Sequence, residues 1–287
     1  MSRRPEMKDS PFSRGRRERV LCIMAALILT AALFCSCGAE GGKSCDVWFF
    51  NVGKADAILL DLAGKYVMID CGEKDTGKEL VKALKEKGIN RLEYLIITHF
   101  DKDHVGGAAR VLEELTVGCV LQNAREKDSD EYDDYVDAVK KSGVATVTVR
   151  ERYDFETGGA SFSVIPGAGG YDKDKSNNYS LVTAANIGGV SFLFAGDIQT
   201  ERIDELLADG AVHADILKVP YHGKEEERFT ELLAAVSPEV AVITSSDKEP
   251  ESESSMEALK AAGVTTYLTR EGTVRISVKD GTYSVGR

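Results

Sequence analysis

The chain of 287 residues lacks the patterns that several common kinds of site require. It has no Cys-x-x-Cys pair, which argues against a thiolate zinc site. Outside the first 37 residues its cysteines are only Cys45, Cys71 and Cys119, an odd and widely spaced set that forms no disulfide framework. It also lacks a Gly-x-Ser-x-Gly elbow, which excludes the common strand-turn-helix serine nucleophile.

Composition predicts a globular protein, since 43% of the residues are hydrophobic and 29% are charged. The net charge is −11, but residues 1–37 carry +4, so the remainder carries −15. A body this acidic has no general attraction for nucleic acid. Part of this excess negative charge could belong to carboxylates that bind metal ions and are neutralised by them.

The first 37 residues have the order of a signal peptide: a basic stretch ending at Arg19, an apolar run at 20–34, and small residues. Residues 34–37 read FCSC and resemble the lipobox of bacterial lipoproteins, in which the last cysteine, here Cys37, is lipidated. An uncleaved membrane anchor and simple secretion remain open. All three hypotheses place the body outside the cytoplasmic membrane, attached to it or secreted.

We therefore expect a signal peptide with a lipobox at 1–37, a tether at 38–45 and one folded domain at 46–287, because no Pro/Ser-rich linker or repeat divides the rest. Periodicity predicts strands at 47–50, 57–60, 66–69, 94–97, 117–121, 161–165, 179–184, 190–194, 215–219, 240–244, 265–268 and 273–278. It predicts helices at 77–87, 105–115, 130–141, 201–207, 225–236 and 255–261. This order suggests two packed sheets with helices outside.

The strongest chemical signal is at residues 98–107, which read THFDKDHVGG and follow the buried strand at 94–97. Two imidazoles and two carboxylates within six residues suit a divalent cation; the alternative is a polar loop with a helix-capping aspartate. Asp197 and His222 each follow a later strand, and alone each would be an ordinary turn residue. Together they would supply the second half of a two-metal site.

Six segments then occur in the order of a known family, namely residues 51–57 (NVGKADA), 69–72 (IDCG), 98–107, 177–180 (NNYS), 195–197 (AGD) and 217–223 (LKVPYHG). They resemble the metallo-β-lactamase-type domain found at the C-terminus of ComEC competence proteins and in free-standing relatives. The resemblance covers about residues 46–287. It implies an α/β (α+β) fold, a four-layer αβ/βα sandwich with metals at one edge of the two sheets.

The resemblance also implies two metal sites that share one carboxylate. The first would be formed by His99, Asp101 and Asn178, the second by Asp103, His104 and His222, and the bridge by Asp197. Asp70 resembles the buried aspartate that orients a ligand from behind. Asn178 falls where many members use a third histidine and the competence-type branch has asparagine.

One segment departs from the family, since residues 221–224 read YHGK where this branch usually reads HHGS. Tyr221 or Lys224 could replace the missing pair as a proton donor or phosphate contact, or be ordinary loop residues. A further histidine that is usual in the last third is absent at 246–250. His213 matches no motif and is expected to be structural.

The resulting hypothesis is an exported hydrolase that uses a metal-bound hydroxide at a dinuclear site, with Asp103, Asp197 and His222 central to catalysis. The two cations would be zinc or manganese, with magnesium possible. The substrate would be a phosphodiester, in a small molecule or a nucleic acid. A small ester, lactone or phosphate is the alternative substrate, and a non-catalytic binding lipoprotein is the alternative class. No protein partner follows from the sequence.

Overall fold

The computed structural model describes residues 44–172, 174–210 and 213–287. The predicted signal peptide, the lipidation site at Cys37 and nearly all of the tether lie outside these residues. The first strand, β1 (Cys45–Phe49), begins one residue before the predicted domain boundary at 46, which is within the ordinary uncertainty of strand ends. None of the helices in the described ranges is long and apolar enough to cross a membrane.

The first of two sheets has eight strands among the described residues. In spatial order they are β15 (Thr282–Gly286), β14 (Val274–Lys279), β1, β2 (Ile58–Asp61), β3 (Tyr66–Ile69), β4 (Arg91–Ile97), β5 (Thr116–Gln122) and β6 (Ala145–Thr148). Strands β3, β4 and β5 are parallel, so their carboxyl ends meet at one edge of the sheet. The segment predicted as a buried strand at 94–97 is the end of β4.

The second sheet has seven strands in the same described part of the chain. Their order is β13 (Thr265–Leu268), β12 (Val240–Ile243), β11 (Ile216–Lys218), β10 (Val190–Phe194), β9 (Val182–Ile187), β8 (Ala160–Ile165) and β7 (Tyr153–Thr157). Strands β10 to β13 are parallel, so polar residues that follow β10, β11 and β12 gather at one edge.

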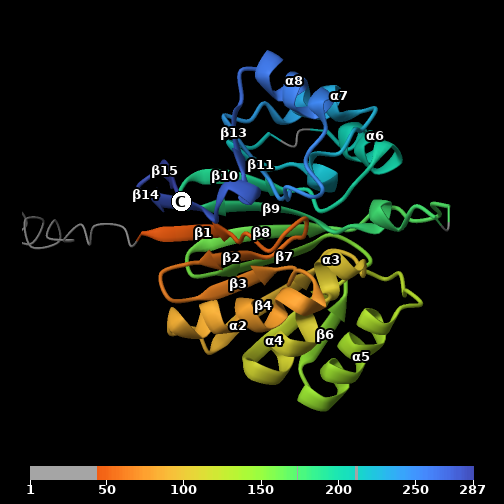
Figure 1. Ribbon diagram of the computed structural model, residues 1–287, viewed down its shortest axis with the longest axis vertical. Helices are drawn as coiled ribbons and strands as arrows, with labels where there is room; N and C mark the ends of the chain where they lie inside the picture. Colours follow the sequence, from red (N-terminus) through yellow and green to blue (C-terminus); the bar gives the residue numbers. More distant parts are fainter. Residues whose placement is uncertain (1–43, 173, 211–212) are drawn as a thin grey trace, which may run out of the picture. The chain divides into compact units, whose positions relative to one another are not determined.

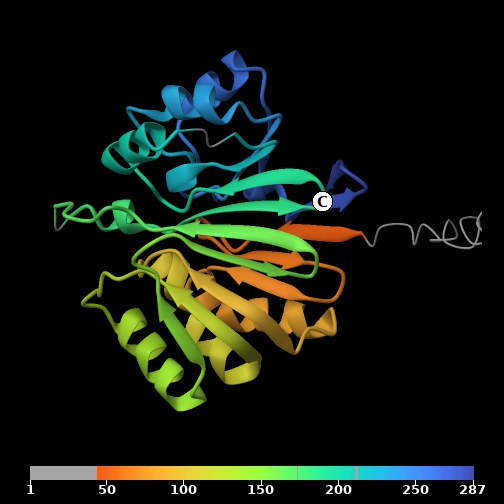
Figure 2. The same cartoon turned by 180° about the vertical axis from the view of Figure 1, so that it is seen from behind.

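Helices cover the outer face of each sheet, and the two sheets lie between these helix layers (Figures 1 and 2). On the first sheet they are α2 (Gly77–Glu86), α3 (Lys102–Val105), α4 (Ala108–Glu114) and α5 (Asp130–Ser142). On the second they are α6 (Thr200–Ala208), α7 (Phe229–Val236) and α8 (Glu253–Ala261). Short 3-10 turns are η1 (Lys74–Thr76), η2 (Ser176–Tyr179), η3 (Pro220–Gly223) and η4 (Thr269–Glu271). The predicted αβ/βα sandwich is confirmed.

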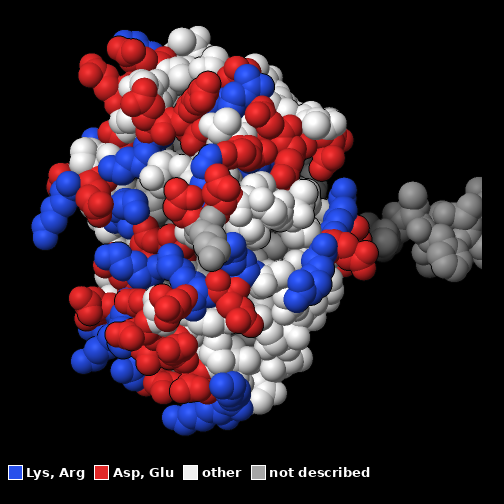
Figure 3. All heavy atoms as spheres, turned by 90° about the vertical axis from the view of Figure 1, so that its right-hand side faces the viewer, with Lys and Arg blue, Asp and Glu red and all other residues white. Residues whose placement is uncertain are grey.

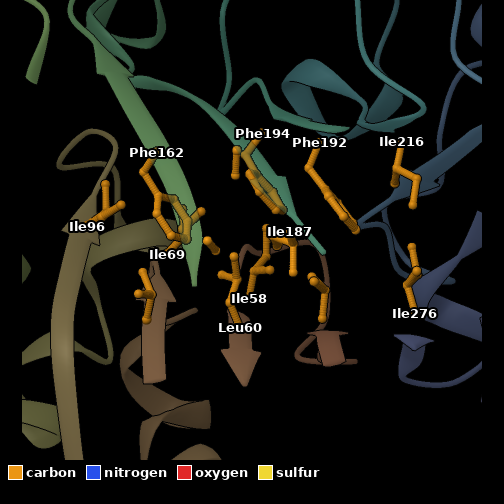
Figure 4. Close-up of a cluster of buried hydrophobic side chains, with 14 of the residues drawn as sticks. Ile58, Leu60, Ile69, Ile96, Phe162, Ile187, Phe192, Phe194, Ile216 and Ile276 are labelled. Carbon is orange, nitrogen blue, oxygen red and sulfur yellow. The ribbon is translucent and has the colours of Figure 1, made fainter. Parts of the chain in front are cut away.

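The space between the sheets is filled by apolar side chains from both inner faces (Figure 4). Ile58 and Leu60 of β2 face Phe192 and Phe194 of β10, and all four are almost completely buried. Alternate residues of each strand enter this core because strand side chains alternate between the two faces of a sheet. The core therefore fixes both sheets relative to each other, and with them the strand ends that carry the polar motifs.

The helix predicted at 105–115 is divided in two, and this division lies at the polar motif. It begins at Lys102 and is interrupted at Gly106 and Gly107, between α3 and α4. A Cβ on Gly106 would lie 2.5 Å from the backbone nitrogen of Lys74, and one on Gly107 would lie 2.2 Å from the carbonyl oxygen of Cys71. Only glycine permits this backbone contact, which holds α3 against the loop after β3.

Three strands were not predicted, and each is an edge strand of its sheet: β6, β7 and β15. Their side chains are mostly exposed or half-buried, so they lack the apolar run that marks a central strand. The strand predicted at 179–184 was wrong at its start. It begins at Val182, because residues 176–179 form η2.

Candidate metal centre

Four of the predicted ligands meet where the carboxyl ends of β4, β10 and β11 converge. They are Asp103, His104, Asp197 and His222, whose potential ligand atoms all lie within 4.8 Å of one another. Asp197 Oδ2 is 3.3 Å from His104 Nε2 and 3.1 Å from His222 Nε2. Asp103 Oδ2 is 3.4 Å from His222 Nε2. One sheet thus supplies Asp103 and His104, and the other supplies Asp197 and His222.

Both imidazoles in this cluster are oriented through their second ring nitrogen. His104 Nδ1 is 2.7 Å from Asp70 Oδ2, and that carboxylate also accepts bonds from the backbone N–H and hydroxyl of Thr98. His222 Nδ1 is 2.9 Å from the carbonyl oxygen of Thr244. An Nδ1–H that donates to oxygen leaves Nε2 as the lone-pair nitrogen, directed at the cluster. Asp70 therefore lies behind a candidate ligand, and its role in orienting that ligand stays a prediction.

The turn that carries His222 has an unusual backbone. Tyr221 and His222 both have φ near +51°, in the left-handed region that costs a non-glycine residue roughly 1–2 kcal/mol. Pro220 begins this turn and Gly223 ends it with φ +68°. The turn brings the His222 ring against Thr244, the residue after β12, so the strained conformation directs the imidazole to the cluster.

The other half of the predicted pair of sites is more open. His99 is buried, its Nδ1 lies 3.2 Å from Ser180 Oγ, and its Nε2 has no hydrogen-bond partner among the described residues. The nearest carboxylate oxygen in an ion pair with it is Asp101 Oδ1, at 3.8 Å. Burial lowers the pKa of His99, so the ring is a neutral base. A buried imidazole nitrogen without a hydrogen-bond partner destabilises the folded state unless a ligand binds to it.

Asn178 is buried next to this half, but its amide has other partners. Its Oδ1 accepts from the backbone N–H of Gln199 at 2.8 Å, and its Nδ2 donates to Glu201 at 2.7 Å. These bonds hold η2 against the start of α6. The predicted role of Asn178 as a metal ligand stays a prediction, and would use the second lone pair of its amide oxygen.

The side chains of His213 and Lys224 bond to groups outside the cluster. His213 is exposed, and its Nδ1 is 2.9 Å from the carbonyl oxygen of Val236, as expected for a structural residue. Lys224 donates to the carbonyl oxygen of Pro250 at 2.9 Å. This bond directs the Lys224 ammonium at the 246–250 loop, which weakens the hypothesis that it donates a proton. Tyr221 is half-buried beside His222.

A buried ion pair that was not predicted from the sequence lies beneath the cluster, formed by Asp56 and Lys218. Each of these two residues is 1% exposed, and Lys218 Nζ is 2.5 Å from Asp56 Oδ2. The same ammonium lies 2.9 Å from the carbonyl oxygen of Gly196 and 3.4 Å from Asp197 Oδ1. Two signals were available: a lysine inside the apolar strand 216–219, and an aspartate inside the quoted 51–57 motif.

The cluster attracts positive charge strongly. Burial favours neutral His104, but the carboxylates of Asp197 and Asp70 outweigh it and raise the His104 pKa well above its ordinary value. Burial would also raise the pKa of Asp197, yet His222, His104 and Lys218 hold it well below the ordinary value. Carboxylates that stay ionised beside imidazoles form a mixed oxygen and nitrogen donor set of the kind that zinc and manganese accept. The residues present therefore fit a divalent metal.

Comparison with known proteins agrees with this geometry. The chain matches the family model described as Metallo-beta-lactamase superfamily over residues 51–245, a span that includes all of the candidate ligands. The chain belongs to the metallo-β-lactamase superfamily. Its fold is that of metal-dependent hydrolases, and two metal ions are typical of this superfamily. Which residues hold them here is a proposal.

Within the superfamily, the chain is similar to competence proteins. It is 30% identical over 169 residues to ComE operon protein 3 of Bacillus subtilis, which is 58% of this chain and 22% of that protein. It is 26% identical over 205 residues to Recombination protein 2 of Haemophilus influenzae, 70% of this chain and 24% of that protein. The chain spans about a quarter of these relatives, and the predicted resemblance to the ComEC-type domain is confirmed.

Solved structures support the fold alone. The metallo-beta-lactamase fold protein YhfI from Bacillus subtilis superposes with a TM-score of 0.53 at 9% identity, covering 84% of this chain and 99% of that one. CmlA, a diiron beta-hydroxylase from Streptomyces venezuelae, gives 0.52 at 16% identity, covering 82% and 54%. Such low identities carry no information about substrate.

Proposed function

We propose that this metallo-β-lactamase superfamily chain is an exported, metal-dependent phosphodiesterase. The observation that carries the proposal is the buried convergence of Asp103, His104, Asp197 and His222, from both sheets, beside the unpartnered Nε2 of His99. The similarity to proteins named for competence and for recombination favours phosphodiester bonds over other esters. The acidic net charge argues against broad affinity for nucleic acid. We therefore expect the substrate to be a short nucleic acid or an accessible phosphodiester bond.

Each residue of the centre has a separate task in this proposal. His99 and Asp101, with Asn178, would hold one metal; Asp103, His104 and His222 would hold the other; Asp197 would serve both. When bound, the metals supply an activated water and stabilise charge on the attacked phosphoryl group. Asp70 and Thr244 keep the Nε2 atoms of the two histidines directed inward. Lys218 contacts Asp197 and, after the larger contributions of His222 and His104, helps to keep the pKa of this carboxylate low.

The identity of the metal is expected to affect the rate. The first site would have one imidazole with three oxygen donors, which favours manganese or magnesium relative to a histidine-rich pocket. We expect zinc to occupy the purified protein. Metal-stripped protein reloaded with manganese should hydrolyse a model phosphodiester several-fold faster than the same protein reloaded with zinc. A maximal rate with zinc alone, unimproved by manganese, would contradict the oxygen-rich first site.

A substrate panel tests the proposal directly. Metal-loaded protein would be assayed against a model phosphodiester, a phosphomonoester, a carboxylic ester and a short single-stranded oligonucleotide. The highest kcat/KM is expected for a phosphodiester. Hydrolysis of only the carboxylic ester or the monoester would favour the small-substrate alternative. Failure to retain metal on dialysis, together with no hydrolysis, would favour a binding lipoprotein with a degenerate site.

We also propose that the chain is held at the membrane through a lipid on Cys37. The support is the basic, apolar and small-residue order of residues 1–37, which lie outside the described structure. Mass spectrometry of protein extracted from membranes should find a diacylglyceryl group on Cys37 as the first residue. An intact N-terminus at Met1 would refute lipidation and cleavage together.

A further inference from the structure

Two lysines form ion pairs with the carboxylate oxygens that face the candidate histidines. Lys54 Nζ is 2.5 Å from Asp103 Oδ2, and this same oxygen is 3.4 Å from His222 Nε2. Lys127 Nζ is 2.6 Å from Asp101 Oδ1, the oxygen that lies 3.8 Å from His99 Nε2. In each pair the ammonium contacts the same carboxylate oxygen that would bind a metal ion placed beside the imidazole. The two lysines therefore stand in for cations, one at each predicted site.

Unlike Lys218 on the floor of the centre, these lysines reach it from solvent. The side chain of Lys54 is 19% exposed and that of Lys127 is 33% exposed, whereas Lys218 is fully buried. Lys127 lines a pocket of about 260 Å³ together with His99, Asp101 and other residues of the loops after β4 and β5. A lysine with a flexible stem at such a mouth can move its charge outward without refolding.

Figure 3 shows the side of the molecule that lies at the right in Figure 1, near α3 and α6. This face carries charges of both signs. Lys and Arg side chains gather across the middle of this face, and acidic side chains dominate below, over α5. Because acidic side chains are interspersed with the basic ones over this face, an anionic substrate would be attracted only locally, beside individual lysines and arginines. This pattern favours a localised anion site over a broad nucleic-acid surface.

Charge balance indicates what the lysines do once metals are bound. Five carboxylates and three ammonium groups form ion pairs with one another or with the candidate histidines, and these eight groups have a formal charge of −2 when the histidines are neutral. They are those of Asp56, Asp70, Asp101, Asp103, Asp197, Lys54, Lys127 and Lys218. Two divalent cations would change this charge to +2. The two outer ammonium groups would then be repelled from the carboxylates they held. An anion bound at the mouth would restore the balance.

We infer that Lys54 and Lys127 release Asp103 and Asp101 when metals bind, and then bind the non-bridging phosphate oxygens of the substrate. The inference rests on the proposed phosphodiesterase function and assigns its substrate-binding cations. Lysine is a common phosphate contact because its compact ammonium has three donors that rotate freely. The exchange also makes substrate binding depend on metal binding, since without metal both ammonium groups are occupied by carboxylates.

The test uses the full chain with Lys54 and Lys127 replaced singly and together by glutamine. Two titrations are compared: manganese into metal-stripped protein, and inorganic phosphate into manganese-loaded protein, both by calorimetry. The double variant should bind manganese at least as tightly as the wild type, because the competing ammonium groups are gone. It should bind phosphate at least about 10-fold more weakly, equivalent to 1.4 kcal/mol. These opposite changes are not expected from a purely structural role.

Lys102→Gln is the matched control, because Lys102 lies between the same two aspartates. Its ammonium is 3.6 Å from Glu73 and its side chain is 68% exposed, so neither titration should change. With a single-stranded oligonucleotide, KM should rise in the double variant. The slope of log affinity against log salt should fall by about 1.4 for two lost phosphate contacts.

The outcomes separate this inference from the proposed function. Unchanged phosphate affinity in the double variant, or weakened manganese binding, would overturn the exchange. Wild-type protein that cleaves phosphodiesters while the double variant keeps its KM would overturn it too, and leave the proposed function standing. If the wild type cleaves no phosphodiester, the proposed function fails, and the phosphate titration still decides whether the lysines bind anions.

Discussion

Replacing His222 by asparagine is expected to lower phosphodiester hydrolysis at least about 100-fold, in the range typical for loss of one transition-state stabilising group. His222 Nε2 contacts both Asp103 and Asp197, so its loss removes one candidate ligand from the four-residue cluster. Asparagine tolerates the left-handed backbone at this position better than alanine, so the η3 turn should persist. Elemental analysis of the purified variant should find less bound metal than in the wild type.

The matched control is His213→Asn, which also removes an imidazole but at an exposed position that contacts Val236. It should keep wild-type activity and metal content. Circular dichroism melts of both variants establish that they are folded. If His213→Asn loses activity and metal while His222→Asn keeps them, the family alignment of this segment is shifted and the proposed ligand set is wrong.

Replacing Lys218 by methionine is expected to lower the free energy of unfolding of the metal-free protein by about 3–5 kcal/mol, the cost of removing one partner from a buried ion pair. The ammonium of Lys218 lies 2.5 Å from Asp56 and 3.4 Å from Asp197, and none of these side chains is appreciably exposed. Without it, two buried carboxylates lose their common counter-ion. Urea denaturation with chelator present measures the change.

Two further measurements keep this prediction distinct from a general packing defect. Lys218→Met combined with Asp56→Asn should regain at least half of the lost stability, because one uncompensated charge is removed with little change of shape. Saturating metal should narrow the difference from the wild type, because a cation at Asp197 replaces part of the missing charge. Lys82→Met, which breaks an exposed pair with Glu86, should change stability by less than about 1 kcal/mol. Equal urea midpoints for wild type and Lys218→Met would contradict the prediction.

The amino-acid sequence determined the class of fold and most of the polar motifs. Central strands such as β4 and β10 end in short apolar runs, and the motifs with His99 and Asp197 directly follow them, so the order of elements was readable. The run from His99 to His104 fixed the chemistry, because two imidazoles and two carboxylates at that spacing have few other uses. The edge strands β6, β7 and β15 were not predicted because their exposed and half-buried side chains leave no apolar pattern.

The tertiary structure alone decided which polar residues lie beneath and beside the centre. Lys218 and Asp56 are 162 positions apart in the chain, and only the packing of the two sheets brings a strand lysine onto a loop carboxylate. Strand order within the first sheet set Lys54, after β1, against Asp103, after β4. It also set Lys127, after β5, against Asp101, and no local spacing marks either pair. Local sequence encodes which backbone forms a strand or turn through short-range sterics and hydrophobic periodicity. Electrostatic pairing between distant segments depends on distance in space, which exists only once the core between the sheets has formed.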